Sequence, residues 1–289
     1  MRASRGAGFT LVELLVSLAI LGILMAGFTY LFGNTLTVTR QVDVRNDILG
    51  DAQIAQNLMV SRLQEAWYVY PSATSLSLPS TGVGWQTANP VGGSNTFTVG
   101  SNLVAVIDPP QNVAANCTAS PLFTDGCYHF YAYYPVLRSA YVTGTAGSFA
   151  NRLLADTQNP NAWVLMQYDA FVTDGVIPPD LSGCVSTDDP PPITTGQILQ
   201  CNASFFTSLT GSLFSARANL LADYLTPNVS PFTLTDLTTG NLPPAPDVQQ
   251  VTVNPTFTRL YRGTTYAVGG SGSTLSTDVV GRNQKFPAN

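Results

Sequence analysis

The apolar run from Leu14 to Gly33 constrains the fold of this chain more than any other feature. A helix of that length spans about 30 Å, which matches the hydrocarbon thickness of a bilayer. No charged residue occurs from Leu14 to Thr39, so the sequence predicts one transmembrane helix. Arg2 and Arg5 precede it without an acid, and the positive-inside rule therefore places the N-terminus in the cytoplasm and the rest of the chain on the far side.

Glu13 stands immediately before this run and needs an explanation. A charge at the bilayer centre costs about 2.5 to 3.5 kcal/mol, so an ionisable residue in such a segment is a candidate functional group. A secretory signal peptide is cut after its apolar region, whereas here the small residue that could mark a cut, Gly8, precedes it. Cleavage after Gly8 would keep the apolar segment and make Phe9 the amino terminus.

Phe9 and Glu13 lie four residues, or about one helical turn, apart. In a helical assembly with a similar axial offset, the Phe9 amine would face Glu13 of a neighbouring chain, and two charges that are costly in lipid would offset one another. In the alternative interpretation, Glu13 reaches the polar headgroups of the membrane. Gly22, Gly27, Gly33 and Gly50 also allow two interpretations, close packing of helices in the membrane or local melting or bending of the helix in a packed assembly.

The helix is expected to continue beyond the membrane as an amphipathic segment. Apolar residues recur along it at steps of three and four: Ile48, Ala52, Ala55, Met59, Leu63 and Ala66. A polar set lies about 200° round the helix: Asn46, Gly50, Gln53, Asn57, Ser61 and Gln64. One face should therefore pack on protein and the other should meet water, until Pro71 ends the helix. The predicted helix, residues 9–70, would be on the order of 90 Å long.

Residues 71–289 predict a β-rich globular head. In the whole chain Gly and Pro together number 44 and only 10% of residues are charged, which is typical of a turn-rich chain with an apolar core. The candidate strands are Thr96–Val99, Asn102–Ile107, Cys127–Leu137, Trp163–Val172 (with a short helix as the alternative), and one hairpin or two short strands within Gln249–Val268. Pro135 indicates an edge or a bulge, and Leu213–Leu225 suggests a short helix. The expected fold class is α+β, with the long helix, transmembrane in its first half, packed on an antiparallel head.

The four cysteines form two local couples, Cys117 with Cys127 and Cys184 with Cys201. Neither couple has the CxxC spacing of zinc or thioredoxin-like sites. We therefore expect two disulfides that close small loops in an oxidising compartment, each contributing about 2 to 4 kcal/mol. Four free buried thiols and the other two pairings are the alternatives.

No residue pattern in the head indicates catalysis or nucleic-acid binding. A catalytic triad needs a histidine base, and the only histidine, His129, lies in an aromatic strand, where we expect a structural role. From Pro71 onward seven Lys and Arg face twelve Asp, so a basic footprint for nucleic acid is missing. We expect a non-enzymatic head without a cofactor. Calcium is the one candidate ligand, through the aspartates in the middle of the head: Asp169, Asp174, Asp180, Asp188 and Asp189.

The stretch GFTLVELLVSLAILG resembles the N-terminal signature of type IV pilins and pseudopilins. The family has a short basic leader (residues 1–8 here), a glycine before the cut, an aromatic first mature residue and a glutamate five places into the mature chain. The head resembles the PilW and pseudopilin J group of minor pilins through RLQEAW at the helix end, YHFYAYYPVLR, the LADYL run, and Arg282 with Asn283 near the C-terminus.

The resemblance implies cleavage after Gly8 by prepilin peptidase, methylation of the Phe9 amine, and a role for Glu13 in subunit registration. Before assembly the chain would sit in the inner membrane with its head in the periplasm. An inner-membrane assembly platform would then extract it into a filament with other major and minor pilins. The head is large for a repeating shaft subunit, so we expect a minor pilin that primes or caps a type IV pilus. The alternatives are a type II secretion pseudopilin and a tip-presented adhesin or ligand-binding module.

Overall fold

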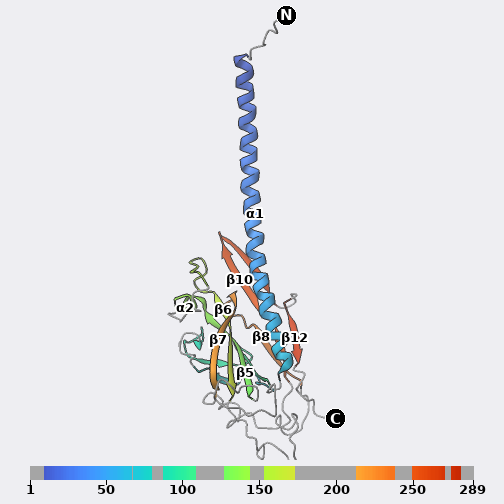
Figure 1. The fold of residues 1–289 in the computed structure, drawn as a ribbon, viewed down its shortest axis with the longest axis vertical. Coiled ribbons are helices and arrows are strands. Elements are labelled where there is room, and N and C mark those ends of the chain that lie inside the picture. The colour runs from blue at the N-terminus through green and yellow to red at the C-terminus, as the bar shows by residue number, and fades with distance from the viewer. Residues whose placement is uncertain are drawn as a thin grey trace, which may run out of the picture. The chain divides into compact units, whose positions relative to one another are not determined.

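The computed structural model describes residues 10–66, 68–79, 87–108, 127–143, 153–172, 213–237, 249–270 and 275–280 (Figure 1). Two helices and twelve strands occur in these ranges: α1 Leu11–Glu65, β1 Tyr68–Val69, β2 Ser75–Ser77, β3 Thr96–Thr98, β4 Val104–Asp108, β5 Tyr128–Leu137, α2 Arg138–Thr143, β6 Trp163–Val172, β7 Leu213–Leu225, β8 Phe232–Asp236, β9 Gln249–Val253, β10 Thr256–Tyr261, β11 Thr264–Gly269 and β12 Thr277–Val280. The chain divides into two compact units, Met1–Asp47 and Ile48–Asn289.

The first unit consists, in its described part, of one uninterrupted helical segment. α1 has 55 residues in all, or about 80 Å of helix. The predicted end at Tyr70 is wrong, because α1 ends at Glu65 and Tyr68–Val69 is a strand instead. Pairing on the edge of β4 overrides the helical pattern there: Tyr68 pairs with Ile107, and the Tyr70 N–H donates to the Ala105 carbonyl at 3.0 Å.

A seven-stranded antiparallel sheet dominates the second unit, with the strand order β1-β4-β5-β6-β7-β10-β11. A three-stranded sheet, β12-β9-β8, and a two-stranded sheet, β2-β3, accompany it. All pairs between the described strands are antiparallel, as the sequence predicted. The long N-terminal helix is packed on this β-rich head through the part of α1 that follows Ile48.

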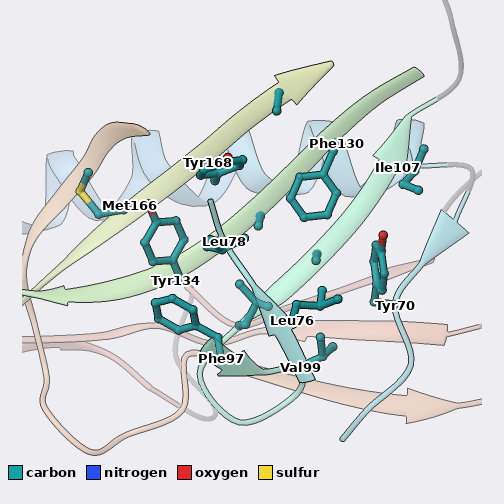
Figure 2. Packing of buried hydrophobic residues seen from close by; sticks show 14 of the residues in the cluster. Tyr70, Leu76, Leu78, Phe97, Val99, Ile107, Phe130, Tyr134, Met166 and Tyr168 are labelled. Atoms are coloured by element: carbon teal, nitrogen blue, oxygen red, sulfur yellow. The ribbon is translucent and has the colours of Figure 1, made fainter. Parts of the chain in front are cut away.

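Successive side chains of a strand point to opposite faces of the large sheet, and one of these faces carries an apolar cluster. Phe130, Ala132 and Tyr134 of β5 point into an apolar cluster with Met166 and Tyr168 of β6. The β2 and β3 strands cover this cluster, and Figure 2 shows it in front of the sheet with the helix behind. The covering residues come from β2, β3 and the residues that flank them: Leu76, Leu78, Phe97 and Val99.

Two strand predictions change in the structure. Leu213–Leu225 forms strand β7 and not a short helix, because it pairs along β6 from Val172 to Trp163. The segment Gln249–Val268 holds three strands, β9, β10 and β11, so one hairpin or two strands was too few. Trp163–Val172 is a strand with the predicted bounds.

Pro135 lies where strand β5 has only one neighbour among the described strands. β4 pairs with β5 as far as Tyr133, while β6 continues to pair with it through Leu137. Pro135 is therefore at a local edge, where the missing N–H removes no bond to a second strand. The predicted edge is confirmed, although β5 as a whole is an inner strand of the sheet.

Candidate functional site

Glu13 forms a capping box with Thr10 at the start of α1. Its Oε2 accepts hydrogen bonds from the Thr10 N–H and the Thr10 hydroxyl, each at 3.0 Å, and the Glu13 N–H donates to Thr10 Oγ1 at 3.3 Å. This reciprocal pattern satisfies two N–H groups that a helix start leaves open. Both hydrogen bonds to the carboxylate end on Oε2. Among the described residues none donates to Oε1, so Oε1 is able to accept a hydrogen bond from another chain. The T-x-x-E spacing was a sequence signal for the role of Thr10.

The N-terminal part of α1 exposes its apolar side chains on all sides. Every residue from Thr10 to Arg40 is exposed, and the helix is long and apolar enough to cross a membrane. The hydroxyls of this segment donate to carbonyls one turn earlier, for example Ser17 to Glu13 at 2.7 Å and Thr29 to Met25 at 2.8 Å. The segment therefore presents little unsatisfied polarity, which suits lipid or a bundle of helices.

The helix glycines have open space beside them. A Cβ placed on Gly22, Gly27 or Gly33 would meet no described atom within 4 Å. In the close-packing interpretation, the partners of these glycines would therefore be helices of other chains. Both interpretations of the glycines, close packing and local melting, stay predictions.

The amphipathic face of α1 in the second unit is buried as predicted. All six apolar residues of the pattern are at most 4% exposed: Ile48, Ala52, Ala55, Met59, Leu63 and Ala66. Gln53, Asn57 and Ser61 on the opposite face are exposed. Gln56 is buried at the margin, where its Nε2 donates to Thr277 Oγ1 of β12 at 2.6 Å. The sequence pattern did not single out Gln56, since its partner lies 221 residues away.

A cluster of polar and aromatic groups lies where the end of α1 meets the sheet. The Arg62 guanidinium stands over the Tyr131 ring, 5.0 Å from its centroid. Asp108, at the end of β4, is 6% exposed, and no described residue donates a hydrogen bond to either of its carboxylate oxygens. Burial raises the pKa of Asp108 to about 7, while the Arg62 charge opposes this rise and the Glu65 charge adds to it.

His129 has the contacts of a structural imidazole, the role that the sequence analysis favoured. Its ring stacks on Phe171 with centroids 4.2 Å apart, and its Nδ1 lies 2.8 Å from the Tyr131 hydroxyl. Nε2 is 2.6 Å from Asp169 Oδ1, without the alignment of a hydrogen bond. These contacts hold the ring against β6.

Arg138 and Asp223 form a buried ion pair that joins two of the motifs behind the minor-pilin resemblance. Arg138 closes YHFYAYYPVLR and Asp223 is the centre of LADYL. Arg138 Nε donates to Asp223 Oδ1 at 2.8 Å and Nη2 donates to Oδ2 at 3.0 Å, with the side chains only 5% and 8% exposed. Nη2 also donates to the Leu154 carbonyl at 2.9 Å. A bidentate pair of this kind fixes geometry as well as charge.

The other site residues of the sequence analysis fall outside the described residues. These are Gly8, Phe9, Cys117, Cys184, Cys201, Asp174, Asp180, Asp188 and Asp189. Cys127 is buried at 3% exposure. The two disulfides, the cleavage site and the calcium interpretation therefore stay predictions. Among the described residues, no three His, Cys, Asp or Glu side chains are grouped to hold a metal.

Comparison with known proteins identifies the N-terminal segment. Residues 3–29 match the family model of the prokaryotic N-terminal methylation motif. The match covers Gly8, Phe9, Thr10 and Glu13, and it agrees with the resemblance to type IV pilins and pseudopilins. No curated protein and no solved structure matches the chain.

Proposed function

We propose that this chain is a non-enzymatic minor pilin of a type IV pilus, which assembles through its N-terminal helix and primes or caps the filament. The observation that carries the proposal is the helix from Thr10 to Arg40, apolar and exposed along its whole length, with Glu13 at its start inside a methylation motif. Such a surface must be covered in each state that the protein occupies. Lipid would cover it before assembly, and helices of other pilins would cover it afterwards.

Glu13 would serve the assembled state. In the single chain its Oε2 is held by Thr10, and the Glu13 side chain lies at the exposed helix start. The amine of Phe9 from a neighbouring subunit can supply the missing donor with a compensating positive charge. Two ionic groups in an apolar surrounding are stable only as a pair, so this contact would fix the axial register of neighbouring subunits.

The head supports the choice of a minor subunit. Residues Ile48–Asn289 form one unit around a seven-stranded sheet, which is a large body to repeat along a shaft. A type II secretion pseudopilin would use the same helix and the same methylation motif, so it is the second candidate. Deletion of the gene distinguishes the two, since it would abolish piliation in the first case and secretion in the second.

The test is the Glu13→Ala variant in cells. We expect it to stay in the membrane at the wild-type level and to be lost from sheared filaments. Ser17→Ala, one turn further along the same exposed helix, is the matched control and should be recovered in filaments like the wild type. Recovery of Glu13→Ala in filaments at the wild-type level would refute the assembly role of Glu13.

A further inference from the structure

We propose that the outer edge of strand β11 accepts an extended strand of a different pilin subunit, which adds to the seven-stranded sheet. The inference rests on the proposed function, because it names a second contact that the head would make during assembly. The edges of the described sheets differ in how they are protected from further strands. Exposed edges with unpaired N–H and C=O groups attract further strands, so proteins usually shorten, charge or cover them.

The other edges of the larger sheets have such protection. β1, at the opposite edge of the seven-stranded sheet, has two residues, both buried. In the three-stranded sheet, the outer strands β8 and β12 have five and four residues, and β12 carries the exposed Asp278. β11 has six residues, TTYAVG, without a charge or a proline, and its only partner among the described strands is β10.

The hairpin geometry tells which groups of β11 face the open edge. Arg262 and Gly263 form a two-residue turn with φ of 50° and 79°, the pattern of a type I′ turn. In such a hairpin the pair beside the turn, Tyr261 with Thr264, is hydrogen-bonded, and bonded and non-bonded pairs then alternate. Thr265 and Ala267 therefore direct their N–H and C=O groups away from β10. Both residues are exposed.

The inner edge of the same hairpin supports this assignment and provides a contrast. Leu260, opposite Thr265, turns its backbone groups away from β11, where the Asn159 side chain accepts from its N–H at 2.7 Å and donates to its carbonyl at 2.9 Å. Asn159 thus imitates a neighbouring strand beyond the end of β7. Gln158 Oε1 accepts from the Arg262 N–H at 3.1 Å in the same way. The protein caps the inner edge with two amide side chains, whereas no described residue caps the outer edge.

The chemistry of the edge selects the occupant. Only an extended polypeptide can pair with a row of backbone groups. From Thr256 to Gly270 the sole charged residues are Arg259 and Arg262, so an uncharged or acidic strand is favoured. A second copy would pair β11 with β11 around a two-fold axis and close a dimer, whereas filament subunits add head to tail. The strand that pairs with β11 therefore belongs to a pilin subunit other than a second copy of this chain.

The first experiment replaces Ala267 by proline in the full-length chain. Ala267→Pro removes one outward N–H and keeps every bond between β10 and β11, and proline is tolerated on edge strands. We expect wild-type amounts in the membrane and about tenfold less chain in sheared filaments, because β11 loses an N–H that would donate to the incoming strand. Ala267→Val keeps the N–H and should behave like the wild type. Equal recovery of Ala267→Pro and wild type would overturn the proposal.

The second experiment remains decisive if the proline variant is unstable. A photo-crosslinking amino acid at Thr265 should give an adduct with a different pilin subunit, identified by mass spectrometry of purified filaments. No adduct, or an adduct only with a second copy of this chain, would overturn the proposal. Absence of the wild-type chain from filaments would instead refute the proposed function, so the two failures are distinguishable.

Discussion

Replacing Asp108 by asparagine should remove a pH dependence from the stability of the head. Asp108 is buried beside the end of α1, and no described residue donates a hydrogen bond to its carboxylate. In the described part of the chain the charges that act on it are those of Arg62 and Glu65 of α1, and the neighbouring Tyr133 hydroxyl of β5 is buried there without a hydrogen-bond partner. Asparagine has nearly the same shape and stays neutral, so the variant isolates the effect of the charge.

The sign and size follow from the pKa of Asp108, which burial raises from 3.8 to about 7. Between these values the folded head keeps the proton while the unfolded chain has lost it, so stability falls as pH rises from about 4 to about 7. Above that range the loss is complete and the profile becomes flat. A tenfold change in proton affinity corresponds to about 1.4 kcal/mol, which sets an upper bound of about 4 kcal/mol on the loss.

Urea unfolding of the full chain in detergent, followed by tryptophan fluorescence at pH 5 and pH 8, measures this dependence. The wild type should lose more stability than Asp108→Asn between the two values, and the variant should be the more stable protein at pH 8. Asp278→Asn, at an exposed aspartate on β12, is the control and should follow the wild type. Parallel profiles for wild type and Asp108→Asn would show that the Asp108 carboxyl does not cause the pH dependence.

Two further substitutions test the packing of the head, with urea unfolding as the assay for each. Asp223→Ala leaves the Arg138 guanidinium buried without its partner and should cost about 3 to 5 kcal/mol, whereas a loss below about 1 kcal/mol would mean that the ion pair contributes little. Met59→Ala opens a cavity in the fully buried face of α1 and should cost about 2 to 5 kcal/mol, while Gln53→Ala on the exposed face should stay within about 0.5 kcal/mol.

The helix was predictable because its determinants are local. Spacing alone identified the apolar face that α1 and Ala66 bury, since a 3.6-residue period fixes which side chains share a face. The end of α1 was misplaced because Tyr68 and Val69 exchange helical bonds for pairing with β4, a strand that comes much later in the chain. A sequence pattern near residue 68 contains no information about that edge.

The head was predictable in its strands but not in its contacts. Trp163–Val172 was predictable as a strand from its apolar and aromatic content. The alanines and leucines of β7 favour a helix when the sequence is considered alone, and β7 is a strand because it pairs with β6. The pairing of Arg138 with Asp223 spans 85 residues, and that of Asn159 with Leu260 spans 101. Contacts of such separation depend on the assembled sheet, so they become visible only in the structure.

The presence of this chain in filaments is best measured by mass spectrometry of sheared and purified pili. We expect the filaments to contain this chain, with an N-terminal peptide that begins at Phe9 and has a methylated amine. Absence of the chain from filaments, or an N-terminal peptide that begins at Met1, would show that it is not a processed pilin.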